Sequence, residues 1–282
     1  MRSGRLTVDG AELYYEVRGV GPALLMISGA GGDAGYYSGI AEGLADAFTV
    51  ITYDRRGNSR STGGDDGPME LARQAADARD LVGALAGGRA LVFGNSGGAI
   101  VGLTLAALHP ECMLGLIAHE PPAVNVLPDG DPGRGFFAEL AGLYAAGGAP
   151  AAGRRFGETT RGEGSYRWPA DLWKRFLGNA DHLFGREWPA FAAFHPDEEA
   201  LRAAPFPIVL GAGADDRGTY YALPSIEIAR RIGVPWVEFP GIHMEFLRHP
   251  SRFAAAVRVL ATQMYAADGK VPDLWRGAPE AP

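Results

Sequence analysis

The chain has 282 residues, of which 47% are hydrophobic, enough to bury one sizeable core. Its 26 basic and 33 acidic side chains give a net charge of −7 without any block of Lys or Arg, which argues against a nucleic acid or an anionic membrane as a partner. The single cysteine, Cys112, excludes an internal disulfide and a cysteine-based metal cluster.

Short apolar runs typical of strands alternate with helical patterns from the start of the chain. Continuous apolar runs such as residues 23–27 indicate strands that are buried on both faces of a mostly parallel sheet. The pattern predicts strands at 5–8, 12–17, 23–27, 49–53, 90–93 and 114–118, and helices at 36–47, 69–85 and 99–108.

This alternation stops after Glu120-Pro121-Pro122 and resumes about eighty residues later. It then predicts strands at 207–210 and 236–239, a helix at 224–232 and a last helix from Phe246. The interruption contains helical segments rich in Phe, Tyr and Trp, so we expect a helical cap over the carboxyl edge of the sheet, with three or four aromatic side chains lining a pocket. The expected division is a core at 1–122 and 205–269, a cap at 123–204 and a C-terminal surface tail at 270–282.

The first ten residues contain no apolar stretch, so we expect no secretory signal and a cytoplasmic protein. The longest helix-like apolar run, at 99–108, is too short to span a bilayer and is expected to be a core helix.

The most informative segment, residues 90–102, predicts a buried strand, a sharp turn with one serine, and an apolar helix. A serine on such a turn projects its hydroxyl above the sheet, and the flanking backbones come close enough to require glycine. Gly94 and Gly98 flank Ser96 at the spacing Gly-x-Ser-x-Gly. The segment therefore predicts a nucleophile elbow.

With these elements, residues 5–267 resemble the α/β-hydrolase superfamily. The resemblance includes the Ser-Gly-Ala-Gly-Gly segment at 28–32, similar to the family's His-Gly-x-x oxyanion loop. It also includes residues 54–61, similar to Asp-x-Arg-Gly-x-Gly-x-Ser, although Ser28 replaces the usual His and Ser59 a usual Gly. The resemblance implies an α/β fold with an eight-stranded, mostly parallel sheet flanked by helices and a helical cap inserted after strand 6.

A serine needs a base and an orienting acid, which the family supplies in the chain order Ser, acid, His. His243 follows the last predicted strand, where the superfamily places its base. The family's Gly-x-x-Asp spacing favours Asp216 as the acid over its neighbour Asp215. Glu120, which follows strand 6, is a third candidate, because some relatives carry the acid there. The predicted catalytic set is thus Ser96, His243 and Asp216, with Asp215 and Glu120 as alternative acids.

Acyl transfer develops negative charge on an oxygen, so hydrogen-bond donors must point at that position. We expect the N–H of Gly97, next to the nucleophile, to be one donor and the N–H of Ala30, after strand 3, to be the second, with Gly31 as an alternative. Arg55 and Arg56 are expected to hold loops together by hydrogen bonds rather than to bind an anionic substrate.

The leading hypothesis is a serine hydrolase that cleaves an ester, thioester or lactone of a small hydrophobic molecule through an acyl-enzyme. The same residues serve relatives in carbon–carbon bond hydrolysis, lyase, perhydrolase or cofactor-free oxygenase reactions, and a ligand receptor with slow turnover is a third possibility. No cofactor and no metal is expected, since no pair of histidines has helical i, i+4 spacing. The oligomeric state stays open.

Overall fold

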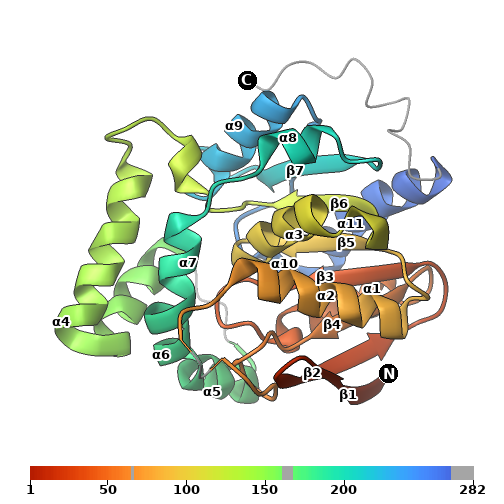
Figure 1. Cartoon of the computed structure of the whole chain (residues 1–282), viewed down its shortest axis with the longest axis horizontal. Coiled ribbons are helices and arrows are strands. Elements are labelled where there is room, and N and C mark those ends of the chain that lie inside the picture. The colour runs from red at the N-terminus through yellow and green to blue at the C-terminus, as the bar shows by residue number, and fades with distance from the viewer. Residues whose placement is uncertain (65–66, 161–167, 268–282) are drawn as a thin grey trace.

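The computed structural model describes residues 1–64, 67–160 and 168–267, so the predicted tail at 270–282 lies outside the described residues. An eight-stranded sheet in the order β1-β2-β4-β3-β5-β6-β7-β8 runs through the molecule (Figure 1). β2 pairs antiparallel with β1 and β4, and the other neighbours pair in parallel. The strands are β1 (Arg2–Val8), β2 (Ala11–Arg18), β3 (Ala23–Ile27), β4 (Thr49–Tyr53), β5 (Ala90–Asn95), β6 (Met113–His119), β7 (Ile208–Gly213) and β8 (Trp236–Phe239).

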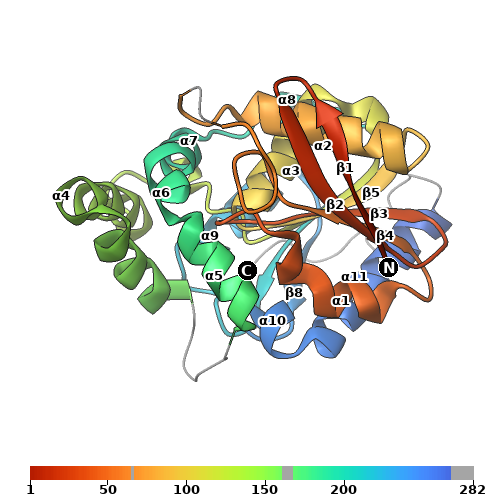
Figure 2. The same cartoon turned by 90° about the horizontal axis from the view of Figure 1, so that it is seen from below.

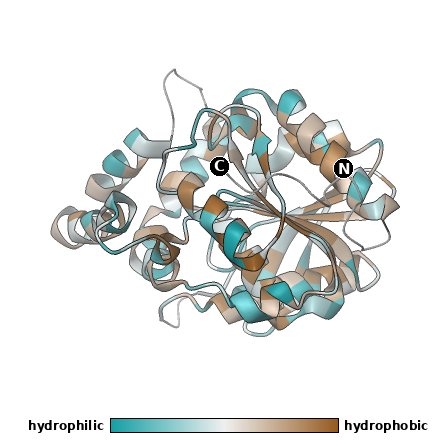
Figure 3. Ribbon diagram, turned by 90° about the horizontal axis from the view of Figure 1, so that it is seen from above, coloured by the Kyte–Doolittle hydropathy of each residue, from teal (hydrophilic) through white to brown (hydrophobic). Residues whose placement is uncertain are grey.

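Helices cover both faces of this sheet because successive residues of the central strands point to opposite sides. In β3, Leu25 and Ile27 pack into the same apolar cluster as α2, α3 and α9, whereas Leu24 and Met26 pack with α1, α10 and α11. Figure 2 shows these two layers on either side of the strands, and Figure 3 shows the apolar colouring concentrated along the sheet. The helices are α1 (Ser38–Leu44), α2 (Leu71–Leu85), α3 (Gly97–Leu108), α9 (Ala222–Ile232), α10 (Glu245–Arg248) and α11 (Pro250–Ala266).

A helical insertion, which we define as residues 123–204, separates β6 from β7 and lies at one end of the sheet (Figures 1 and 2). Its long segment α4 bends at Gly148, whose φ of 65° favours glycine. Trp188 stacks on Phe137 at a ring-centroid distance of 4.3 Å and anchors the insertion internally. The segments are η3 (Val124–Val126), α4 (Pro132–Thr160), α5 (Ala170–Gly178), α6 (Ala180–His182), η4 (Leu183–Glu187), α7 (Trp188–Ala193) and α8 (Glu198–Arg202).

The predicted α/β class and the eight-stranded, mostly parallel sheet are confirmed, but two predicted helices have different boundaries. The predicted helix at 36–47 is a 3-10 turn, η1 (Ala34–Tyr37), followed by the shorter α1. The last helix is broken, because Pro250 has no backbone N–H and starts α11 after α10 has ended. No helix among the described residues is both long and apolar enough to cross a membrane.

Two short connections at the carboxyl end of the strands bring the predicted site residues together. The β3 loop, defined here as residues 28–33, precedes η1, and the β8 loop, residues 240–244, precedes α10. Both lie beside the turn between β5 and α3, because parallel strands end at the same sheet edge.

Candidate active site

Ser96 lies on the sharp turn between β5 and α3. Its φ of 57° and ψ of −127° are sparsely populated for a residue with a side chain, and this strain sets the hydroxyl above the sheet edge. A Cβ on Gly98 would lie 2.0 Å from the carbonyl oxygen of Ile27, and one on Gly94 would lie 2.4 Å from that of Gly98. The flanking glycines are therefore required by close backbone approach, as predicted.

His243 lies in the β8 loop and forms a short contact with Glu120, the residue that follows β6. Its Nδ1 lies 2.5 Å from Oε2 of Glu120. The second carboxylate oxygen, Oε1, accepts a hydrogen bond of 2.8 Å from the N–H of Gly213. Both side chains are buried, Glu120 completely. The acid thus holds the imidazole ring in one orientation and favours the tautomer with its proton on Nδ1.

Several groups keep Glu120 ionised in this buried position. Burial alone would raise its pKa, but the hydrogen bonds with His243 and with the Gly213 N–H favour the charged form, and the pKa lies below the usual value. The backbone at Glu120 is also unusual for a non-glycine residue, with a φ of 51°. This conformation turns the chain sharply at the end of β6 and leaves Glu120 below the β8 loop.

The structure does not place Asp216, the acid favoured from the sequence, on Nδ1 of His243; the alternative candidate Glu120 is there instead. Asp216 is buried beside the site, where its Oδ1 accepts a hydrogen bond of 3.3 Å from the Tyr221 hydroxyl. Burial and the charge of Glu120 raise its pKa to about 6. Asp215 is exposed. The Gly-x-x-Asp spacing placed Asp216 near His243, but among the described residues the carboxylate that contacts the ring Nδ1 is that of Glu120, which follows β6.

His119, the last residue of β6, forms a second buried imidazole behind the site. Its Nδ1 lies 2.8 Å from Nδ2 of Asn95, the residue before the nucleophile. The ring is fully buried and packs edge-on against Phe239 at a centroid distance of 4.8 Å. Burial lowers the pKa of His119 to about 4, so the ring is neutral at physiological pH. Sequence reasoning missed this residue, whose only signal was its place beside Glu120 at a strand end.

The expected oxyanion donors lie at the same turn. Gly29 is in contact with the elbow, since a Cβ there would lie 2.8 Å from Cβ of Ser96 and 3.4 Å from the N atom of Gly97. Ala30 follows it and lines the cavity that contains Ser96. Within the described residues, the N–H groups of Ala30 and Gly97 have no hydrogen-bond acceptor. Two backbone donors thus remain available beside the serine.

The β3 loop is fixed by Arg55, whose side chain is fully buried. Its Nε and Nη2 donate to the carbonyl oxygens of Ser28 and Gly29, each at 2.8 Å. The same guanidinium pairs with Glu187 of the helical insertion, at 2.7 Å from Nη1 to Oε1. Arg56 instead pairs with Asp77 at 2.6 Å. Both arginines hold loops together, as predicted, although nothing in the sequence pointed to Glu187 as a partner.

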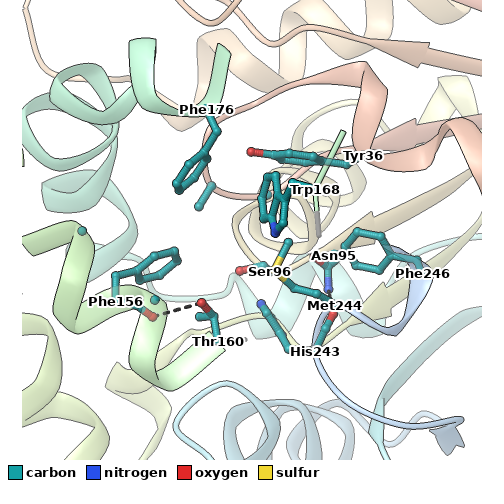
Figure 4. A pocket seen from close by; sticks show the side chains of 14 residues that line it. Tyr36, Asn95, Ser96, Phe156, Thr160, Trp168, Phe176, His243, Met244 and Phe246 are labelled. Atoms are coloured by element: carbon teal, nitrogen blue, oxygen red, sulfur yellow. Dashed lines mark hydrogen bonds between the residues drawn. The ribbon is translucent and has the colours of Figure 1, made fainter. Parts of the chain in front are cut away.

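A cavity with about 540 Å³ of empty space, including its open mouth, lies between the sheet edge and the helical insertion. Figure 4 shows the side chains of Ser96 and His243 on one side of this cavity, facing aromatic rings from the insertion. Most of the wall is apolar. The lining includes Phe156, Trp168 and Phe176 from the insertion together with Tyr36, Met244 and Phe246. The insertion thus supplies three aromatic side chains to the lining, where three or four were expected.

Comparisons with known proteins agree with this fold. The sequence profile of the family described as "alpha/beta hydrolase fold" matches residues 22–194. The chain is 31% identical to the uncharacterized hydrolase YraK of Bacillus subtilis (strain 168) over 261 residues, which cover 90% of this chain and 94% of YraK.

Two solved structures are similar as well. A thermophilic esterase from Thermogutta terrifontis superposes with a TM-score of 0.75 at 20% identity, covering 94% of this chain and 99% of the esterase. A hydrolase from Pseudomonas aeruginosa PA01 superposes with a TM-score of 0.69 at 25% identity, covering 91% and 97% of the two chains. With its sheet order, nucleophile turn and family profile all in agreement, the chain belongs to the α/β-hydrolase fold family and is a hydrolase of that fold.

Proposed function

We propose that the protein is a serine hydrolase that cleaves a carboxylic ester, thioester or lactone of a small hydrophobic molecule. The observation that carries the proposal is the buried 2.5 Å contact between Glu120 and His243 next to a cavity that contains Ser96. A carboxylate on Nδ1 leaves Nε2 of the imidazole unprotonated, which is the state a general base requires.

In the proposed reaction, His243 takes the hydroxyl proton of Ser96 on Nε2 as the serine oxygen bonds to the carbonyl carbon. The resulting oxyanion accepts hydrogen bonds from the N–H groups of Ala30 and Gly97. Its collapse breaks the bond to the leaving oxygen or sulfur, which receives the proton from Nε2. Water then attacks the acyl-enzyme by the same route, with His243 again as base, and releases the acid and Ser96.

Glu120 is proposed to be the third member of this set. Its negative charge stabilises the imidazolium that exists while His243 holds the serine proton, and its hydrogen bond fixes the ring. The residue is fully buried, so this interaction is little screened by solvent.

The helical insertion is proposed to act as a cap that selects the substrate. It supplies Phe156, Trp168 and Phe176 to the cavity wall, and these rings favour an apolar acyl or alcohol group. Ser96 and Ala30 line the same cavity, and the polar carbonyl group would lie at their end of it.

Labelling with a fluorophosphonate tests the nucleophile and p-nitrophenyl esters of increasing chain length test the reaction. We expect the label on Ser96, located by peptide mass spectrometry, and turnover of the esters. Ser96→Ala and His243→Ala should each lower kcat by several orders of magnitude, and the double variant should lose little more. His195→Ala, at an exposed histidine of the insertion, is the matched control and should be unchanged.

Three outcomes would contradict parts of the proposal. Additive losses in the double variant would show that Ser96 and His243 do not act together. A label on Ser96 without ester turnover would point to carbon–carbon bond cleavage, other chemistry on the same residues, or ligand sensing. No label at all would remove Ser96 from the role of nucleophile.

A further inference from the structure

The peptide group between Gly29 and Ala30 carries the second proposed oxyanion donor, the N–H of Ala30, and it lies beside the nucleophile. A Cβ on Gly29 would be 2.8 Å from Cβ of Ser96. Because the Ala30 nitrogen is only two bonds beyond the Cα of Gly29, it lies within about 7 Å of Cβ of Ser96. Ala30 also lines the cavity that contains Ser96, and its N–H has no acceptor among the described residues.

The direction of this N–H follows from the carbonyl of the same peptide group. The peptide is trans, so it is planar and its C=O and N–H bonds point in opposite directions. The carbonyl oxygen of Gly29 accepts hydrogen bonds from Nη2 of Arg55 at 2.8 Å and from the N–H of Gly32 at 3.0 Å. These two donors therefore hold the N–H of Ala30 on the side of the peptide group that faces away from Arg55.

Arg55 binds the preceding peptide group as well, and the helical insertion holds Arg55. Nε of Arg55 donates to the carbonyl oxygen of Ser28 at 2.8 Å, so one rigid guanidinium fixes two consecutive peptide groups. Both carboxylate oxygens of Glu187 contact the guanidinium, Oε1 at 2.7 Å from Nη1 and Oε2 at 2.8 Å from Nη2. The Arg55 and Glu187 side chains are fully buried, so little room is left for either group to turn.

We infer that Arg55 is a positioning residue for the oxyanion hole, and that Glu187 makes this positioning depend on the helical insertion. Arg55 is not among the residues that line the cavity, so it acts through the peptide group between Gly29 and Ala30. The N–H of that group must already point at the oxyanion when the tetrahedral intermediate forms. A charged donor on the carbonyl oxygen also polarises the peptide group and strengthens its N–H as a donor. This inference rests on the proposed function for the existence of the oxyanion hole.

The same substitution in two neighbouring arginines tests this role. Arg55→Lys keeps a positive charge opposite Glu187 but removes the planar fork that spans two carbonyl oxygens. Arg56→Lys is the matched control, because Arg56 is also buried and its guanidinium bonds instead to Asp77 at 2.6 Å and to the carbonyl oxygen of Asp9 at 2.7 Å. Melting temperatures of both variants show how much stability each one loses.

The expected result is a loss in kcat without a matching change in KM. Removing one oxyanion donor costs about 10² to 10³ in kcat, and misaligning it costs part of that. With p-nitrophenyl butyrate, we therefore expect kcat of Arg55→Lys to fall by about tenfold to a hundredfold, with KM within about threefold of the wild type. For Arg56→Lys, kcat should stay within about threefold even if its melting temperature falls as far.

Two ketones measure the oxyanion hole without turnover. Benzyl trifluoromethyl ketone forms a tetrahedral adduct with an activated serine, whereas benzyl methyl ketone reports binding without an adduct. By calorimetry, the preference for the fluorinated ketone should fall about tenfold or more in Arg55→Lys, with an unchanged Kd for the methyl ketone. Glu187→Gln provides the same comparison if Arg55→Lys does not fold. Whichever way the Gln amide turns, its NH2 group faces an N–H of the guanidinium and displaces it.

The outcomes separate this inference from the proposed reaction. A rise in KM at unchanged kcat, equal losses of affinity for both ketones, or equal kinetic effects of the two lysine substitutions would overturn the inference. A wild-type protein without a preference for the fluorinated ketone would overturn it too. If the wild type prefers that ketone but does not hydrolyse the ester, the proposed hydrolysis alone fails, and the preference measured in Arg55→Lys still decides the role of Arg55.

Discussion

Replacing Glu120 by Gln is the sharpest test of the site, because it removes one charge and keeps the shape of the side chain. The amide oxygen of Gln can still accept from the Gly213 N–H, which donates to Oε1 of Glu120 at 2.8 Å. The amide NH2 then faces Nδ1 of His243, where the carboxylate oxygen lay at 2.5 Å. The imidazole must accept a hydrogen bond there, so its own proton moves to Nε2, the atom that should receive the Ser96 proton.

Two contributions set the size of the loss. The imidazolium formed during catalysis loses a carboxylate partner about 4 Å away between charge centres, worth about 4 kcal/mol at an effective dielectric constant of about 20. This corresponds to about a thousandfold in rate, and the wrong tautomer adds to it, so we expect kcat to fall by about 10³ to 10⁴. Ester hydrolysis and the rate of fluorophosphonate labelling of Ser96 measure the effect, with the melting temperature as a check on folding.

Asp216→Asn is the matched control for this variant. Asp216 is a buried carboxyl of the same site region, but its side chain interacts with the Tyr221 hydroxyl and with the backbone of His243, not with the imidazole Nδ1. We expect its kcat to stay within about threefold of the wild type. A Glu120→Gln enzyme within tenfold of the wild type, or an Asp216→Asn enzyme that loses more than Glu120→Gln, would refute the assignment of the acid.

Three further predictions concern stability. Arg55→Met leaves the buried carboxylate of Glu187 without its partner, and urea unfolding should show a loss of about 3–5 kcal/mol; a loss below about 1 kcal/mol would show that the pair does not hold the folded state. Asp216 has a pKa of about 6 in the folded state against a usual value of 3.8, so the folded state binds more protons than the unfolded state between these pH values. Ionisation of Asp216 therefore costs stability, and this cost reaches its full size above pH 6. Asp216→Asn should therefore raise the melting temperature more at pH 8 than at pH 4, and an equal shift at both pH values would contradict this. Gly98→Ala places a methyl group 2.0 Å from the Ile27 carbonyl oxygen, and we expect a loss of about 3 kcal/mol or more by thermal unfolding; a near-native melting temperature would show that the elbow can widen.

The fold could be predicted from the sequence because its signals are local. The continuous apolar run at 23–27 reports a strand buried on both faces, and β3 (Ala23–Ile27) has these bounds. The elbow could be predicted for the same reason. The nucleophile turn needs glycine on both sides of the serine, and Gly94, Ser96 and Gly98 lie within five consecutive residues. The 3-10 turn η1 was missed because it differs from an α-helix in its hydrogen bonds, which join residues three apart instead of four. The residue pattern of so short a segment does not distinguish the two.

The acid could not be settled from the sequence because its position depends on where two distant segments meet. Glu120 and His243 are 123 residues apart in the chain, and their contact depends on the order of β6, β7 and β8 in the sheet. Asp216 matched the family's spacing and is indeed buried nearby. The spacing alone, however, does not say in which direction a side chain points. The pairing of Arg55 with Glu187 was hidden for the same reason, with one partner in the core and the other in the helical insertion.

The Arg55–Glu187 pair also bears on how this protein could be recombined with its relatives. The guanidinium bonds two carbonyl oxygens of the β3 loop and a carboxylate of the insertion, and both charged groups are fully buried. A chimera that grafts a foreign insertion onto this core would leave Arg55 without its counter-charge unless the graft also supplies a carboxylate at position 187. Asn58, which donates to the same carboxylate at 2.8 Å, would keep only the Arg56 carbonyl oxygen as an acceptor. For this reason the insertion cannot be exchanged on its own. A chimera must also take the residues of the core that pair with the new insertion.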